Sequence, residues 1–329
     1  MRYELPDKIK FIAIILVLAG HLTFPQCLMS YIYCFHMPLF FILSGAFIKK
    51  LDSPATEYIS RQFKRLVLPY FIFGFILIAH YLIYSLFQKY GRMDLDFRQI
   101  FMDFAWGKLS VLWFLSALFC ASILYFFLRK ISTSPTFILT SSFAVAVCAG
   151  FALYGKEGFW CFNIALVALF YFSLGKFIAR IFTKDGNIRW KNALNSRWAP
   201  LAGIVLSAAA FFICPYNLPY EMATMRFGNP LLYIPISLAG CAGVALLAKV
   251  VPYCTVVKWI ASNTLTIFCT HLVVYSWCRG ALKIFLSITY PEHFNTETLL
   301  FNIFLILAAL VASLPIKYCL NKIFPDIIK

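Results

Sequence analysis

Four of the five histidines lie inside long apolar stretches of the sequence, and they are the first candidates for chemistry. They are His21, His36, His80 and His271. An ionisable side chain inside a bilayer costs free energy, so such a residue is a functional candidate by default. A neutral imidazole is the least costly base to keep in a membrane, and its pKa of about 6.5 suits proton abstraction from an alcohol or acyl transfer.

Three of these histidines are expected at one depth in the membrane. With a helical rise of about 1.5 Å per residue, His21, His36 and His271 each lie about 18 Å from the inner end of their stretch, beyond the midplane. His80 lies at about 15 Å. A single histidine of this kind often only hydrogen-bonds a neighbouring helix. A set of three at one depth instead favours a shared site.

A cluster of cations precedes the third apolar stretch. Arg61, Lys64 and Arg65 share one face if the segment is helical. They are either an anchor for anionic lipid headgroups or an anion site for a phosphorylated cofactor that enters from the cytoplasm. Lys10, at the inner start of the first stretch, can join such a site.

Acidic residues and cysteines exclude other kinds of site. No carboxylate lies deep in a stretch, because Glu4, Asp7 and Glu57 fall at inner edges. An ion-coupled transporter usually needs an intramembrane acid, so this absence counts against that class. The 11 cysteines are scattered without a CxxC pair or metal-ligand spacing, so we expect neither disulfides nor a metal.

The composition indicates an integral membrane protein. Hydrophobic residues make up 62% of the 329 residues and charged residues 13%, with a mean hydropathy of +0.82. A soluble domain is nearer half apolar and a quarter charged. The apolar runs are long and continuous, which excludes a porin-type barrel. We predict an all-α, polytopic helix bundle that forms one domain over residues 1–329. The predicted spans, about ten in number, are residues 9–24, 28–48, 70–87, 111–128, 137–154, 160–182, 199–214, 231–250, 259–277 and 299–319.

The positive charge sets the predicted topology. The net charge is +16, but the basic residues sit in short gaps between apolar runs, which favours a topological role over nucleic-acid binding. Of the 29 Lys and Arg residues, 21 fall on the side of the termini and 8 on the other side, so both termini are predicted to be cytoplasmic. The first stretch has no small-residue cleavage site and is predicted to be an uncleaved helix. Mixed charges and aromatic residues over 88–110 predict an amphipathic helix on the outer surface.

Two N-terminal segments resemble a known family. Residues 7–21, DKIKFIAIILVLAGH, are similar to the first helix of the acyltransferase 3 family of membrane acyltransferases, in which a basic residue, ten residues and a histidine follow one another. Lys10 and His21 fit that spacing. Residues 31–45, YIYCFHMPLFFILSG, resemble the second helix of the family, particularly in its fucose 4-O-acetylase-like branch.

Three later segments extend the resemblance along the chain. Residues 61–69, RQFKRLVLP, are similar to the basic segment before the third helix, 112–118, LWFLSAL, to the fourth-helix motif, and 263–271, NTLTIFCTH, to a late helix. There are two departures. Lys64 stands where Arg is expected, which puts the phosphate geometry in doubt, and Thr264 follows Asn263 where Ser is commoner.

The resemblance implies an enzyme that takes an acyl group, usually acetyl, from cytoplasmic acyl-CoA and passes it to a sugar hydroxyl of a lipid-linked or surface glycan. It also implies a bacterial inner membrane as the location. His21 is the expected general base or, alternatively, a transient acetyl carrier, while His36 or His271 orients it or stabilises the oxyanion. The residues expected to bind the phosphates of acetyl-CoA are Lys10, Arg61, Lys64 and Arg65.

The acceptor site and the function classes leave alternatives open. Trp113 and Asn263 are assigned to acceptor binding, although Trp113 also fits an interfacial aromatic anchor. The position of His21 beyond the midplane favours modification of the acceptor on the outer face. The alternatives to an enzyme are a transporter or flippase for a glycan or lipid-linked sugar, and a structural subunit of a glycan-assembly complex.

Overall fold

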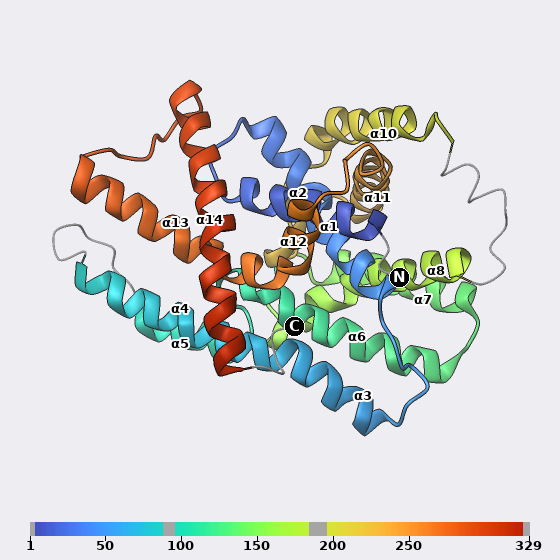
Figure 1. Ribbon diagram of the computed structural model, residues 1–329. Helices are drawn as coiled ribbons and strands as arrows, with labels where there is room; N and C mark the ends of the chain where they lie inside the picture. The colour runs from blue at the N-terminus through green and yellow to red at the C-terminus, as the bar shows by residue number, and fades with distance from the viewer. Residues whose placement is uncertain (1–3, 88–95, 184–195, 325–329) are drawn as a thin grey trace.

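The chain folds into packed helices joined by short connections (Figure 1). The computed structural model describes residues 4–87, 96–183 and 196–324. The helices of the first part are α1 (Glu4–Gly20), α2 (Gln26–Ala46), α3 (Ala55–Gln62), η1 (Phe63–Val67), α4 (Leu68–Phe87), α5 (Phe97–Ala105), η2 (Ser110–Leu112), α6 (Trp113–Ile131) and α7 (Pro135–Ala152). The later elements are η3 (Phe159–Cys161), α8 (Phe162–Thr183), α10 (Ala199–Ile213), η4 (Cys214–Asn217), β1 (Tyr220–Glu221), η5 (Met222–Thr224), β2 (Arg226–Phe227), α11 (Pro230–Leu247), α12 (Thr255–Ser262), α13 (Thr264–Leu286) and α14 (Thr296–Ile323).

The prediction of an all-α, polytopic membrane bundle is confirmed. Within the described residues, eight helices are long and apolar enough to cross a membrane, and the pair α12–α13 is a ninth if it counts as one span. The first predicted span corresponds to α1, which has 17 residues. Each predicted stretch contains a helix, but α1 is not among the helices that are long and apolar enough to span, so the described residues hold eight or nine such helices where about ten were predicted.

Three of the predicted spans have a different shape from the one expected. The fourth begins earlier, because the apolar segment that contains α6 starts with α5, at Phe97 rather than at residue 111. The third begins earlier, because α3, η1 and α4 continue into one another from Ala55 rather than starting at residue 70. The ninth is bent by 80° between α12 and α13. At this bend the Asn263 amide donates to Trp259 O at 2.7 Å and the Thr264 hydroxyl donates to Ala261 O at 2.9 Å. Polar side chains thus bond the carbonyls that a straight helix would use itself.

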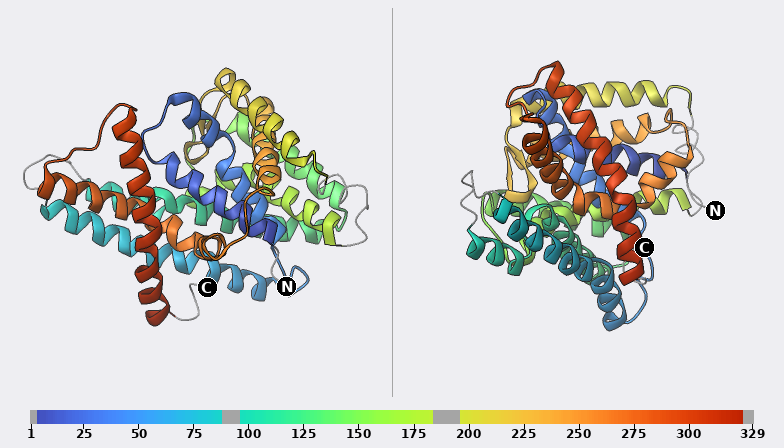
Figure 2. Two further views of the ribbon diagram at one scale, coloured as in Figure 1. Left: turned by 45° about the horizontal axis from the view of Figure 1, so that its top comes forward. Right: turned by 60° about the vertical axis from the view of Figure 1, so that its left-hand side comes forward.

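Helices α2 and α8 form the centre of the bundle. Helix α2 packs against α1, α8 and α11, and α8 packs in turn against α6 and α7. The buried share of the apolar segment is 61% for α2 and 67% for α8, but 22% for both α10 and α14. The helices α10 and α14 therefore offer most of their apolar surface to lipid, and Figure 2 shows them at the outside of the bundle.

The crossing of α2 and α8 depends on two glycines. A Cβ atom on Gly45 would collide with the carbonyl group of Phe172, and a Cβ atom on Gly175 would collide with the carbonyl group of Ile42. Small residues let two membrane helices approach until their backbones touch. Gly45 ends the segment 31–45 noted in the sequence, and this contact is the physical reason for a glycine there.

A helix, α5, forms in the stretch that was expected to carry a helix on the outer surface, but it lies along α4 and belongs to the same apolar segment as α6, Phe97–Ile131. The Asp96 side chain caps it by accepting from the Gln99 N–H at 3.2 Å, and Phe104 stacks on Tyr70 with ring centroids 5.6 Å apart. The first part of that predicted stretch, residues 88–95, lies outside the described residues. Helix α5 thus lies against the side of α4 and closes one side of the bundle (Figure 1).

Substitution of Gly45 should destabilise the bundle. We expect Gly45→Ala to cost about 1–3 kcal/mol, because the added methyl group overpacks a contact between two backbones. Thermal unfolding of the purified protein in detergent measures the effect. Gly280→Ala is the matched control, since a Cβ atom there meets only Tyr84 at an ordinary 3.6 Å. Equal unfolding temperatures for the two variants would contradict the packing described here.

Candidate functional site

His21 lies in a turn inside the protein rather than within a helix. Helix α1 ends at Gly20, and residues 21–25 reverse the chain into α2, so the prediction of a helical span over 9–24 is wrong at its outer end. The last carbonyls of α1 are bonded by tyrosines from other helices. Tyr275 Oη donates to Leu18 O at 3.1 Å, and Tyr33 Oη donates to Gly20 O at 2.9 Å.

Helix α14 and the segment before it hold the rest of this turn. The N–H of Thr23 donates to Tyr290 Oη, the Tyr290 hydroxyl donates to Asn302 Oδ1, and the Asn302 amide donates to Thr23 O, each at 2.7 Å. Irregular backbone is tolerated at membrane depth only where protein groups satisfy its hydrogen bonds. These partners therefore fix the backbone that carries His21.

Three of the four intramembrane histidines come together. The rings of His21 and His271 are 5.0 Å apart between centroids, and His21 and His36 line one small cavity of about 130 Å³. His80 lies elsewhere, with its ring against those of Tyr84 and Trp277. The structure thus joins the histidines that were expected at one depth and separates the one that was expected nearer the inner boundary.

Hydrogen bonds define the tautomers of two of these rings. His36 Nδ1 lies 2.7 Å from Ile32 O, and His271 Nδ1 lies 2.7 Å from Phe268 O. A carbonyl oxygen only accepts, so each Nδ1 carries a proton and each Nε2 of the neutral ring has a free lone pair. The Nε2 atom of His271 is buried and has no hydrogen-bond partner among the described residues. The ring of His271 therefore brings a basic nitrogen without a partner to the contact with His21.

The small cavity includes residues that sequence reasoning missed. Tyr33, Glu221 and Met222 line it together with the two histidines. Tyr33 lies three residues before His36 on α2, a spacing that places two side chains on one helical face and was therefore detectable. Glu221 comes from the hairpin β1–β2, and nothing in the sequence around it indicates that it returns to the histidines.

Trp113 and Asn263 occupy different positions with respect to this cavity. Trp113, the first residue of α6, lines the small cavity and also a second, larger one. Asn263 lies at the bend between α12 and α13, bonded to Trp259 O, and lines neither.

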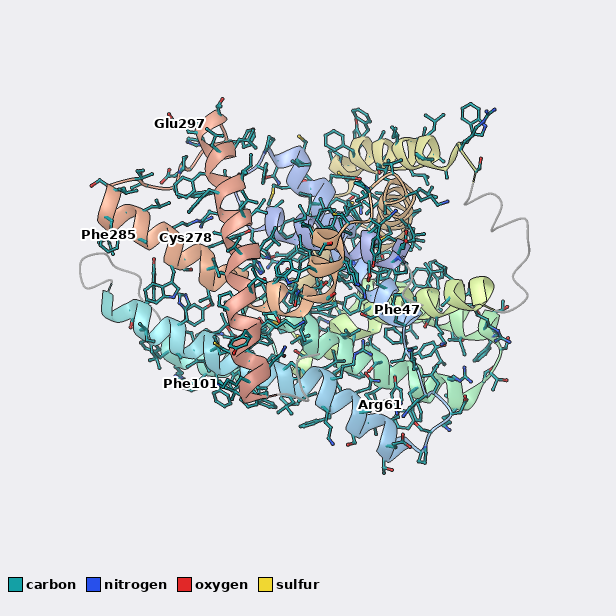
Figure 3. The ribbon with its side chains drawn as sticks, in the orientation of Figure 1. Phe47, Arg61, Phe101, Cys278, Phe285 and Glu297 are labelled. Carbon is teal, nitrogen blue, oxygen red and sulfur yellow. The ribbon has the colours of Figure 1, made fainter. Side chains whose placement is uncertain are left out.

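The basic residues lie on α3 and the turn that follows it. Arg61 belongs to α3, and Figure 3 labels it at the lower edge of the molecule, whereas Lys64 and Arg65 belong to the π-helical turn η1. The Arg61 guanidinium contacts Glu57 at 3.2 Å and donates to Lys50 O at 3.0 Å. A π-helical turn is closed by i→i+5 hydrogen bonds and holds more residues per turn than an α-helix, so the regular helical spacing expected for the three cations is interrupted.

Lys10 and Lys64 complete this set of cations. The Lys10 ammonium lies over the Phe47 ring, 5.1 Å from its centroid. Lys64 is exposed on η1, next to Arg65, which is exposed as well. Exposed cations on one segment can bind a multiply charged anion such as a pyrophosphate or phosphate group.

Comparison with protein families gives one informative match. A family model described as an acyltransferase domain matches residues 6–318, nearly the whole chain. Comparison with curated proteins and with solved structures gave no match.

Removal of the Tyr290 hydroxyl should loosen the turn that carries His21. Tyr290→Phe leaves the part-buried N–H of Thr23 and the Oδ1 of Asn302 without their partner, which costs about 1–3 kcal/mol. Thermal unfolding in detergent measures this loss. Tyr318→Phe is the control, because Tyr318 is 72% exposed on α14. A Tyr290→Phe variant as stable as the control would show that the turn does not depend on these bonds.

Proposed function

The chain belongs to the acyltransferase family whose domain model covers residues 6–318, and from this premise we propose that it moves an acetyl group from cytoplasmic acetyl-CoA to a sugar hydroxyl of a lipid-linked or surface glycan. As a member of that family it is an enzyme, an acyltransferase, and it is embedded in a membrane. The observation that carries the proposal is that His21, from the turn after α1, and His36, from α2, line one small cavity, while the ring of His271 from α13 lies 5.0 Å from the ring of His21. We further propose a bacterial inner membrane as its location and the fucose 4-O-acetylase-like branch as its subfamily, on the segment 31–45.

In the proposed reaction, the acceptor hydroxyl attacks the carbonyl carbon of the acetyl thioester. A carbon–oxygen bond forms, and the bond between that carbon and the sulfur of CoA breaks. The hydroxyl proton passes to a histidine and then to the departing thiolate, so that the products are the acetyl ester and free CoA. A cavity of about 130 Å³ has room for the small acetyl thioester end but not for a sugar beside it.

His21 is the proposed general base. It lines the cavity, and its ring touches His271, whose free Nε2 lone pair stabilises the imidazolium that forms when His21 takes a proton. Glu221 adds a carboxylate to the same cavity and favours the same cation. His36 lines the cavity with an Nε2 that is free to bind a proton of the acceptor, so its proposed role is to orient that hydroxyl.

The donor is proposed to bind from the side of α3. Arg61, Lys64 and Arg65, together with Lys10, take the phosphates of acetyl-CoA, and the narrow pantetheine arm reaches between the helices toward His21. Trp113 contacts the acceptor. Asn263 acts through the bend that begins α13, the helix that carries His271.

Replacement of His21 should abolish turnover without unfolding the protein. We expect His21→Ala to lower the rate of acetyl transfer at least about 100-fold, the usual contribution of a general base. Transfer of radiolabelled acetyl groups from acetyl-CoA by the purified variant measures it. His36→Ala should lose less, because it removes only orientation, and His80→Ala is the matched control outside the cavity. Turnover retained by a folded His21→Ala variant would contradict the assignment of His21 as the general base.

Replacement of Arg65 should weaken donor binding. Loss of one cation from a phosphate site removes a charge-assisted hydrogen bond, so we expect Arg65→Ala to raise the dissociation constant for acetyl-CoA about 10-fold. Isothermal titration calorimetry in detergent measures the constant directly. Lys322→Ala, an exposed cation near the end of α14, is the control. A large loss of turnover with unchanged binding would assign Arg65 a structural role.

A further inference from the structure

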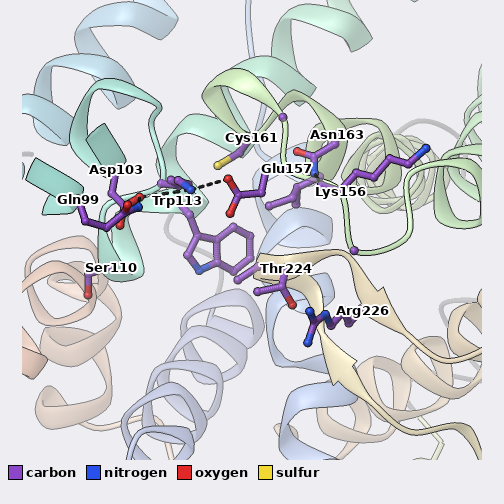
Figure 4. A pocket seen from close by; sticks show the side chains of 15 residues that line it. Gln99, Asp103, Ser110, Trp113, Lys156, Glu157, Cys161, Asn163, Thr224 and Arg226 are labelled. Carbon is purple, nitrogen blue, oxygen red and sulfur yellow. Dashed lines mark hydrogen bonds and ion pairs between the residues drawn. The ribbon is translucent and has the colours of Figure 1, made fainter. Parts of the chain in front are cut away.

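A second and larger cavity lies on the other side of Trp113. Its volume is about 370 Å³, within the range of small-molecule sites of about 300–1,000 Å³. Trp113 and Ala223 line both cavities, so the two adjoin. Figure 4 shows the Trp113 indole in the middle of the residues that line the larger cavity.

Three loops form this cavity and are tied to one another by backbone hydrogen bonds. The N–H of Gly155 donates to Met225 O at 3.1 Å, which joins the loop after α7 to the β1–β2 hairpin. The N–H of Trp160 donates to Trp106 O at 2.8 Å, which joins η3 to the end of α5. The cavity is therefore pre-formed by its own framework, and its walls do not have to fold around a ligand.

Backbone strain gathers in the same walls. Of the six described non-glycine residues with positive φ, Ser110 (48°) and Cys161 (54°) line the cavity, and Trp160 (52°) and Met225 (58°) belong to the backbone bonds that join its loops. Such residues are uncommon and persist where the surrounding structure over-determines them, as at ligand sites.

The polar groups of the cavity suit a ligand that carries several hydroxyls. Lys108 is held between Glu157 at 2.6 Å and Asp103 at 3.3 Å, so donors and acceptors alternate along one wall (Figure 4). The Oδ1 of Asn163 is buried in the wall, and within the described residues it has no hydrogen-bond partner. A buried acceptor without a partner costs free energy, which a donor from a ligand or from its bound water recovers.

We propose that this cavity binds the acceptor carbohydrate, with one sugar ring against Trp113 and the reacting hydroxyl directed past it into the small cavity. The inference rests on the proposed acetyl transfer and adds the site of the second substrate. An aromatic face beside alternating carboxylates, an amide and an ammonium provides apolar contact for the C–H face of a pyranose and hydrogen bonds for its hydroxyls. An acyl chain of a lipid would leave these polar groups without partners.

The position of the cavity also assigns the face on which the acceptor is modified. By the predicted topology Lys156 and Arg226 belong to the outer loops, and both line the cavity. In the right-hand view of Figure 2 the hairpin β1–β2 lies at the left of the bundle, and the basic helix α3 lies apart from it at the lower end. The donor therefore arrives from the inner side and the carbohydrate from the outer side, and they meet at Trp113.

The test measures carbohydrate and donor binding separately. Saturation-transfer difference NMR with the methyl glycosides of fucose, rhamnose, galactose, glucose and N-acetylglucosamine reports sugar binding to the detergent-solubilised protein, and calorimetry reports acetyl-CoA binding. We expect at least one glycoside to bind the wild type. Glu157→Trp, which fills the cavity from an exposed position, should weaken that binding at least about 10-fold, and Glu157→Gln should weaken it by a smaller factor. Acetyl-CoA binding should remain unchanged in both variants.

The control is Glu297→Trp, because Glu297 is an exposed carboxylate at the start of α14 that lines neither cavity. Glycoside binding that survives Glu157→Trp unchanged would overturn the location. A wild type that binds acetyl-CoA but none of the glycosides would overturn carbohydrate as the ligand class. Failure of the wild type to bind acetyl-CoA would contradict the proposed donor instead. Loss of glycoside binding in Glu157→Trp alone would still support this cavity as the carbohydrate site.

Discussion

A turn of irregular backbone buried among membrane helices is the constraint on which the candidate site depends. Between α1 and α2 the chain leaves helical geometry, so its peptide groups need partners other than those that a helix provides. Tyr33, Tyr275, Tyr290 and Asn302 supply the partners instead. Because these residues come from α2, α13, α14 and the segment before α14, the position of His21 is set by the assembly of the whole bundle.

This constraint explains how the two cavities relate to the proposed chemistry. The turn brings His21 against His271, and His21 and His36 line the small cavity that is proposed to hold the acetyl thioester. Trp113 separates it from the larger, polar cavity under the hairpin. In the proposed reaction each substrate therefore has its own chamber, and only the reacting atoms share the space beside the histidines.

The sequence was sufficient to predict the helix bundle and the shared depth of His21, His36 and His271, because hydropathy and helical rise are local properties. The all-α polytopic fold and membership of an acyltransferase family are confirmed. The turn at His21 was missed because Leu22 and Phe24 are apolar, as residues of a continuing membrane helix would be. The residues that bond the turn, Tyr275, Tyr290 and Asn302, are also far along the chain. The larger cavity and Glu221 were also missed, because bonds between backbone groups of distant loops bring them together and leave no pattern of side chains.

The central claim is tested most directly by a structure of the protein with a non-hydrolysable analogue of acetyl-CoA. In this analogue a methylene group stands between the sulfur atom and the acetyl group. The account predicts that the acetyl group lies in the small cavity with its carbonyl carbon near His21 and Trp113, and that the phosphates lie against Arg61, Lys64 and Arg65. An acetyl group bound away from the three histidines, or phosphates on the side of the hairpin, would contradict it.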